Sequence, residues 1–312
     1  MRNSFLLFAK GVAMGAADVV PGVSGGTIAF ISGIYDELLR SIAAVPAALR
    51  ELLRGNVRLA WRTANANFLL VLFSGILGSV FSLARVITWL LEHQPIAIWS
   101  FFFGLIVVSS WLVAREIQRW HWSGWLSFVL GALFAWWITV AAPMQWGHDP
   151  LSLFFAGAIA ICAMILPGIS GSFLLVLMGL YSFVLDAVKT LDLAVLLVFA
   201  AGCACGLLSF ARLLSWMLSH MRNLTLTFLT GLMLGSLNKV WPWKETLTWQ
   251  ADRHGELQPL LQANLLPTRY AEMSGQDPQV ILALLLALGG VMLVLGLEWL
   301  ARRRPDASQS GN

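Results

Sequence analysis

The chain has 312 residues, of which 58% are hydrophobic and 12% charged; its formal net charge is +4 and its mean hydropathy is +0.77. Soluble domains carry about 25% charged residues, so this composition excludes a soluble globular protein and indicates an integral membrane protein. The basic residues gather beside the ends of apolar runs, where anionic lipid is the nearest partner. Their placement therefore argues against nucleic acid as a partner.

The first apolar segment, about residues 11–35, is interrupted by Pro-Gly-Val-Ser-Gly at positions 21–25. Pro and Gly are the residues least suited to a helix interior. Irregular backbone at membrane depth is tolerated only where protein or a water-filled cavity satisfies its polar groups. We therefore expect a re-entrant helical hairpin here, with its tip at the motif.

Apolar runs near the ~20 residues that cross a membrane as helix follow along the chain. A second interrupted segment, about 151–188, carries Pro-Gly-Ile-Ser-Gly and predicts a second re-entrant hairpin. Residues 305–312 are polar and are expected to form a disordered tail. The six expected spans are 68–91, 95–114 and 124–142 after the first hairpin, and 193–218, 224–240 and 279–300 after the second.

The two halves of the chain resemble each other. Residues 11–35 align without gaps on 157–181, and residues 74–93 align on 201–220 in the same order. The second block places Ser82, Arg85, Trp89 and His93 on Ser209, Arg212, Trp216 and His220. We interpret this as a duplicated unit with copies at 1–148 and 149–304, because chance similarity between apolar helices does not match Pro, Arg, Trp and His together.

The arginine-rich loops set the expected topology. If each interrupted segment dips in and returns, a repeat has three crossings, so the second repeat is inverted relative to the first. All the arginine-rich loops and both termini then lie on the cytoplasmic side, as the positive-inside rule requires. The expected fold is an all-α integral membrane protein with two inverted-topology repeats, each a re-entrant helical hairpin plus three transmembrane helices.

Each predicted tip offers a site for an anion. A helix that begins among glycines presents free N–H groups and the positive end of its dipole, and nearby hydroxyls add donors. The alternative is that Gly and Ser only allow short helices to pack closely. The candidate substrate phosphate-binding residues at the tips are Ser24, Gly25, Gly26, Thr27, Ser170, Gly171 and Ser172.

Three charged residues inside apolar segments add to this hypothesis. Arg85 and Arg212 are equivalent in the two repeats, and a guanidinium fork matches the geometry of phosphate. The alternative is that they snorkel to the membrane surface or pair with the hairpin's own carbonyls. Asp18 precedes the first tip, whereas Met164 takes its place in the second. Asp18 is a candidate for proton or sodium coupling, and a structural ion pair with an arginine is an equal alternative.

A hydrolase is the strongest competing interpretation, because Gly-Val-Ser-Gly-Gly at 22–26 fits the pattern around a serine nucleophile. Such a serine needs a base within hydrogen-bond reach, yet the five histidines all lie at span ends or in loops. We therefore expect no catalytic residues, no metal site and no cofactor other than a coupling ion.

The stretch Gly11–Tyr35, read together with Ile-Leu-Pro-Gly-Ile-Ser-Gly-Ser at 165–172, resembles the bacterial polyprenyl-phosphate translocase family, formerly a family of unknown function. The resemblance implies a carrier in the bacterial cytoplasmic (inner) membrane. It would return undecaprenyl phosphate from the outer to the inner leaflet by alternating access, for reuse in cell-envelope synthesis. Its partners would be the polyprenyl-phosphate lipid and membrane lipids, and a homo-oligomer is compatible with the sequence. The alternatives are an ion-coupled carrier of a small soluble anion and a non-transporting membrane scaffold.

Overall fold

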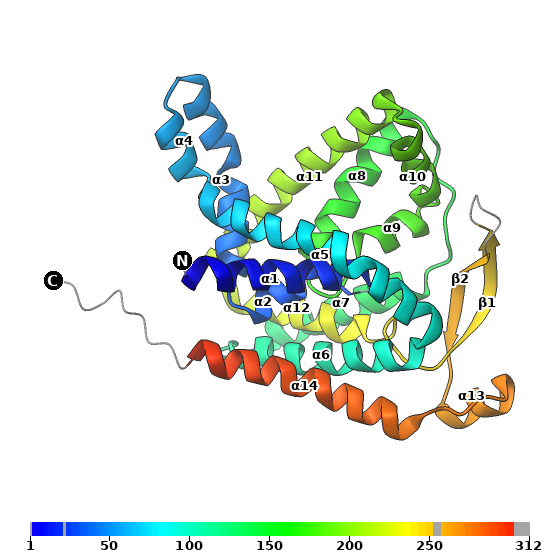
Figure 1. Cartoon of the computed structure of the whole chain (residues 1–312). Coiled ribbons are helices and arrows are strands. Elements are labelled where there is room, and N and C mark those ends of the chain that lie inside the picture. Colours follow the sequence, from blue (N-terminus) through cyan, green and yellow to red (C-terminus); the bar gives the residue numbers. More distant parts are fainter. Residues whose placement is uncertain (1, 21–22, 252–256, 303–312) are drawn as a thin grey trace.

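The computed structural model describes residues 2–20, 23–251 and 257–302, so the expected tail at 305–312 lies outside the described residues. Helices dominate the structure (Figure 1), as the composition predicted. The elements are α1 (Arg2–Val19), α2 (Gly25–Ile31), α3 (Tyr35–Leu53), α4 (Val57–Thr63), α5 (Ala66–His93), α6 (Pro95–Arg115), α7 (Trp122–Val140), α8 (Pro150–Ile165), α9 (Gly171–Leu177), α10 (Tyr181–Thr190), α11 (Leu193–His220), α12 (Arg222–Ser236), β1 (Lys244–Ala251), β2 (Leu257–Asn264), α13 (Pro267–Ser274) and α14 (Val280–Arg302).

Four helices of the described chain, α5, α6, α7 and α11, are long and apolar enough to cross a membrane, and the bent pair α9–α10 would be a fifth if counted as one span. The axes of α9 and α10 meet at 108°. In the apolar part of α11 only 11% of residues are buried, against 61% in α6. Apolar side chains exposed in this way require lipid as their surroundings, so α11 lies at the lipid-facing surface and α6 in the interior.

Several helices from the aligned parts of the two halves have equal lengths and pack in similar pairs. Helices α2 and α9 have 7 residues each, and α5 and α11 have 28 each. The first helix of each half packs against the long one, α1 on α5 and α8 on α11. A Cβ added to Gly11 would collide with the carbonyl oxygen of Leu72, and one added to the equivalent Gly157 would collide with that of Phe199. Both crossings therefore depend on a glycine that lets two backbones touch.

The last two long helices of each half are exchanged between the halves. Helix α6 packs on α14, and α7 packs on α12, so each crossing joins one helix from each half (Figure 1). A Cβ on Gly104 would collide with the Ala287 carbonyl, and one on Gly231 would collide with the Phe128 carbonyl. The boundary at 148/149 is consequently a boundary of the sequence repeat and not of the packing.

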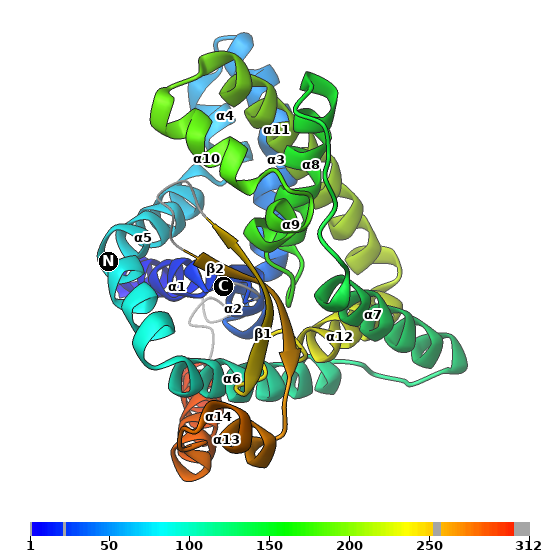
Figure 2. The same ribbon diagram turned by 90° about the vertical axis from the view of Figure 1, so that its right-hand side faces the viewer.

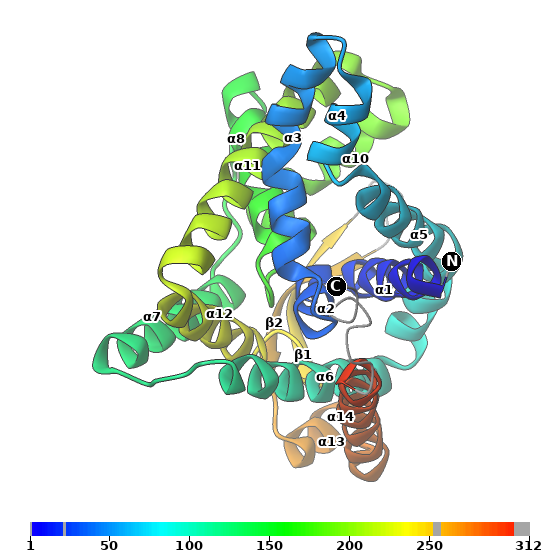
Figure 3. The ribbon, with the colours of Figure 1, turned by 90° about the vertical axis from the view of Figure 1, so that its left-hand side faces the viewer.

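Helix α12 forms the centre of the molecule. Leu226, Leu229, Leu232 and Met233 are all fully buried, because α12 packs against both α7 and α6. Helix α3 also reaches across to the other half and runs against α11, as Figure 3 shows.

The segment after α12, which the sequence indicated only as a loop of about 241–278, contains an antiparallel hairpin and a short helix. Strands β1 and β2 pair from Lys244 with Asn264 to Ala251 with Leu257. The alternation in Lys-Glu-Thr-Leu-Thr-Trp-Gln-Ala fits a half-buried strand, but it is too short to stand out in an apolar chain. Figure 2 shows the hairpin lying across the face between α5 and α12.

Adjacent glycines in α14 give a direct test of this packing. A Cβ on Gly290 would collide with the Phe101 carbonyl, whereas a Cβ on Gly289 meets nothing within 4 Å. We expect Gly290→Ala to destabilise the protein by about 1 to 3 kcal/mol through overpacking, and Gly289→Ala to be neutral or stabilising because Ala favours helix. Thermal unfolding of the detergent-solubilised variants measures the difference. Equal midpoints would show that the α6–α14 crossing is not this close.

Candidate functional site: the contact between two helix-breaking tips

The first tip connects α1 to α2, and its hydroxyls are buried inside the protein. Ser24 and Thr27 have exposed fractions of 1% and 0%. The Ser24 Oγ accepts a hydrogen bond of 3.0 Å from the Gly26 N–H and donates one of 2.9 Å to the Met164 carbonyl. Ser24 is therefore both the N-cap of α2 and a link to the second half of the chain.

The second tip, between α8 and α9, lies directly against the first. The Gly168 N–H donates to Thr27 Oγ1 at 3.2 Å, and the Tyr35 hydroxyl donates to the Ile165 carbonyl at 3.1 Å. A Cβ on Gly26 would collide with the same Ile165 carbonyl. Side chains of the first segment thus satisfy free backbone groups of the second, about 140 residues away, as irregular backbone within a membrane requires.

Asp18 occupies the start of α2. Its Oδ1 accepts a hydrogen bond of 2.7 Å from the Gly25 N–H, and a Cβ on Gly25 would lie 2.5 Å from Oδ2. A carboxylate is the natural partner of the positive end of a helix. Asp18 therefore supplies the first tip with an acidic group of its own. The sequence hypothesis that Asp18 pairs with an arginine is not supported, because no ion pair of Asp18 is found among the described residues.

The second tip has no such carboxylate, because Met164 takes the equivalent position. A Cβ on Gly171 would lie 2.6 Å from the Met164 Cγ. Ser170 makes no capping hydrogen bond to α9; its hydroxyl instead lies 2.9 Å from that of Ser172. The two tips are thus chemically different. A carboxylate accepts a hydrogen bond at the start of α2, whereas none does so at the start of α9 among the described residues.

The structure does not bring the two predicted arginines to the tips. Arg85 is exposed on α5, and Arg212 donates from Nε to the Ala43 carbonyl of α3 at 3.4 Å. No hydrogen bond or ion pair joins either arginine to a tip residue within the described ranges. Arg212 therefore holds α11 against α3 in this conformation.

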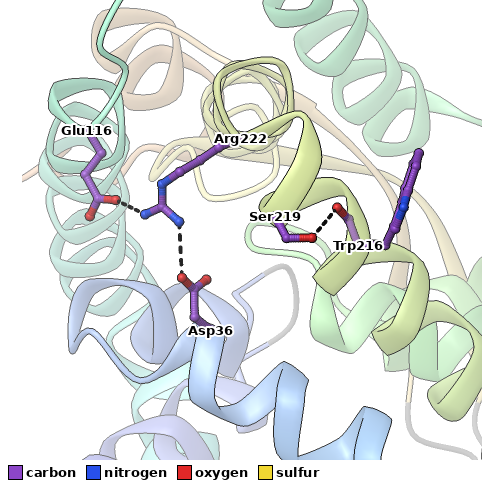
Figure 4. Close-up of polar contacts among 5 residues, drawn as sticks. All are labelled: Asp36, Glu116, Trp216, Ser219 and Arg222. Carbon is purple, nitrogen blue, oxygen red and sulfur yellow. Dashed lines mark hydrogen bonds and ion pairs between the residues drawn. The ribbon is translucent and has the colours of Figure 1, made fainter.

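A charged cluster that sequence reasoning missed joins three elements at the start of α12 (Figure 4). Arg222 contacts Asp36 of α3 at 3.1 Å and Glu116, just after α6, at 2.9 Å. The side chains are 39% to 49% exposed, so each pair stabilises the fold by no more than about 1 kcal/mol. The sequence offered Arg222 only as a marker of topology, since nothing in it pairs position 222 with 36 or 116.

The hydrolase interpretation finds no support in these contacts. Ser24 hydrogen-bonds to backbone groups, and His93 and His220 stack on Trp89 and Trp216 at the ends of α5 and α11. Among the described residues there is no group of three or more His, Cys, Asp or Glu that could hold a metal ion. The geometry is that of a packed polar contact between two broken helices.

The contact between the tips can be tested by removing one hydroxyl. Thr27→Val leaves the Gly168 N–H buried without its partner, which costs about 1 to 3 kcal/mol. Thr230→Val is a matched control, because the equally buried Thr230 hydroxyl only donates to a carbonyl of its own helix, that of Leu226. We expect thermal unfolding to show a clearly lower midpoint for Thr27→Val than for Thr230→Val; the reverse order would contradict the contact.

Known proteins resemble this chain over most of its length. A sequence model of the family described as undecaprenyl phosphate translocase-like matches residues 14–258, which include both tips. The chain is 53% identical over 302 residues to the "Polyprenyl-phosphate transporter" of Vibrio cholerae serotype O1, covering 96% of this chain and 98% of that protein. It is 30% identical over 253 residues to the protein of the same name from Staphylococcus aureus, covering 75% of this chain and 84% of that protein.

No solved structure matches the chain significantly. The extent of the sequence matches is sufficient to assign the family: the chain belongs to the undecaprenyl phosphate translocase-like family of membrane proteins.

Proposed function

We propose that this protein carries undecaprenyl phosphate across the bacterial cytoplasmic membrane, from the outer to the inner leaflet, so that the lipid is reused in envelope synthesis. The observation that carries the proposal is the meeting of the two Pro-Gly-x-Ser-Gly tips between apolar helices, one tip from each half. Two relatives that cover most of the chain are named polyprenyl-phosphate transporters. A lipid with one phosphate needs a polar path for its head group only, while its tail stays in the bilayer.

We further propose that the two halves are inverted in the membrane, with both termini and the arginine-rich loops in the cytoplasm. The equivalent glycine contacts of α1 with α5 and of α8 with α11 support a two-fold relation between the halves. The Arg222 cluster then lies at the cytoplasmic end of α12, and Lys239 and Lys244 lie at its outer end. In this arrangement the Arg222 cluster holds α3, α6 and α12 together on the cytoplasmic side.

If the protein works by alternating access, the rigid units that move against each other cannot be the two sequence halves. Because α6, α7, α12 and α14 are paired across the halves, we propose that they form a fixed frame. The pairs α1–α5 and α8–α11 carry the tips and would move against that frame. Head-group binding is assigned to the tip residues, above all Ser170, Gly171 and Ser172, and Arg85 and Arg212 would meet the phosphate from the two sides in other conformations.

The first test is movement of undecaprenyl phosphate in sealed proteoliposomes, scored by accessibility of the head group on each side. We expect an Arg85→Gln/Arg212→Gln double variant to lower the rate by about tenfold or more, the effect of losing roughly 1.5 kcal/mol from a charge-assisted hydrogen bond. The matched control is Arg58→Gln/Arg62→Gln, which removes two exposed arginines from α4.

The outcomes separate the alternatives. If the native, folded protein moves no lipid under proton or sodium gradients, the proposed function is wrong, and uptake of small soluble anions becomes the next assay. A scaffold would show no transport of either kind. If the native protein transports and the Arg85/Arg212 variant equals its control, transport stands but the arginine path does not.

Asp18 allows structural and coupling roles to be separated. Asp18→Asn keeps an oxygen that can accept from the Gly25 N–H but removes the charge, so a purely capping role predicts little change in stability or transport. A coupling role predicts normal thermal unfolding together with loss of the response of transport to a proton or sodium gradient. Asp18→Leu, which removes the cap, should lower the unfolding midpoint in either case.

A further inference from the structure

Two lysines lie together where α12 ends and β1 begins. Lys244 donates from Nζ to the Lys239 backbone carbonyl at 2.5 Å. Both side chains line a pocket with Phe173 of α9 and a set of amide and hydroxyl groups. The polar groups come from Thr139, Asn238, Gln262 and Asn264. We call this site the lysine pocket.

Neither ammonium group has a carboxylate partner within the described part of the chain. The Nζ of Lys239 lies 4.3 Å from the centre of the Phe173 ring, and that of Lys244 lies 3.8 Å from the centre of the Trp99 ring. Aromatic faces attract cations but stabilise them by only about 0.5 to 2 kcal/mol. Each ammonium has three donors. Of these six donors, one is used among the described residues, in the bond from Lys244 to the Lys239 carbonyl, so most can donate to a ligand.

Two neighbouring, partly buried ammonium groups without a carboxylate partner are unfavourable. Burial lowers the pKa of the Lys244 amine well below its usual value, and the neighbouring Lys239 ammonium lowers it further. An anion bound in the pocket that both side chains line would favour their charged forms. The pocket is also neutral apart from these lysines, since its other polar groups are amides and a hydroxyl, so nothing in it would repel a negative ligand.

The lysine pocket is connected to the second tip. A Cβ on Gly168 would lie 2.8 Å from the Ser236 hydroxyl, and the Lys239 N–H donates to the Ser236 carbonyl at 2.9 Å. From the other side, Phe173 follows Ser172 directly in α9. The Asn238 amide is fixed in place, because it donates to Thr139 at 2.7 Å and accepts from Asn264 at 2.8 Å.

We propose that the lysine pocket binds the phosphate monoester of a polyprenyl phosphate as the head group's first site, before it reaches the second tip. Lys239 and Lys244 supply the charge, and the neighbouring amides supply further donors to a phosphate with several acceptor oxygens. The inference rests on the proposed function for the identity of the ligand. In the proposed orientation the pocket lies on the outer side, where the lipid must be collected.

Binding of farnesyl phosphate, a short-chain probe, to the purified full chain in detergent is the direct test. Lys239→Gln/Lys244→Gln should weaken binding by at least about tenfold, and Lys189→Gln, which changes an exposed lysine on α10, should leave it unchanged. Farnesol, which lacks the phosphate, should not bind at this site. Inorganic phosphate should compete, but only at a higher concentration than farnesyl phosphate.

The possible results either support or overturn the lysine pocket. Equal affinity in native and double-variant protein, or no binding to native protein, overturns it. Equal potency of inorganic and farnesyl phosphate overturns the lipid as the source of the phosphate. Lipid transport by the native protein, measured in parallel, tests the proposed function separately. If the native protein and the double variant transport lipid equally well, the role of the lysine pocket is overturned and the proposed function stands.

A second measurement uses no variant and so does not depend on the double variant folding. Acetylation of lysines in the native protein is followed by peptide mass spectrometry with and without farnesyl phosphate. We expect at least about threefold slower modification of Lys239 and Lys244 in its presence, with Lys189 unaffected as the internal reference. Unchanged rates at a saturating concentration of the probe would overturn the site.

Discussion

The fold depends on the requirement that a broken helix inside a membrane must have its backbone groups satisfied by protein. Each tip leaves carbonyl and N–H groups without helical partners, and in this chain side chains of the first half supply partners for both: Asp18 and Ser24 accept from the start of α2, and three hydroxyls reach the second tip. The Met164 and Ile165 carbonyls at the end of α8 are met by hydroxyls of Ser24 and Tyr35, and the Gly168 N–H is met by Thr27. The second tip therefore depends on side chains of the first half, and the helices around the two tips are held together by this contact.

This shared contact also makes the two tips unequal. A protein with perfectly equivalent halves would offer the same site twice, but Asp18 holds the start of α2 and Met164 replaces it beside α9. The lysines lie next to the second tip only. The two tips therefore offer an anion different surroundings, with a carboxylate beside the first and two lysines near the second.

Much of the architecture was predictable from the sequence because helix length and the Pro-Gly-x-Ser-Gly repeat are local features. The expected spans 68–91, 95–114, 124–142 and 193–218 match α5, α6, α7 and α11, the helices of the described chain that are long and apolar enough to cross a membrane. Contacts between distant segments were not predictable. Position 222 carries no signal for Asp36. Sequence reasoning did not single out Lys239 and Lys244, because their proximity is created by the turn between α12 and β1.

The exchange of helices between the halves has a consequence for how the protein is made. Helices α6 and α7 are synthesised first, but the helices they pack on, α14 and α12, follow more than 80 residues later. Until then the faces of α6 and α7 that contain Gly104 and Gly131 lack the helices on which they pack in the finished fold. In lipid, faces with small residues associate with other helices. The crossing of α6 with α14 can therefore form only after nearly all of the described chain has been synthesised, so the native packing of the first half waits for the second.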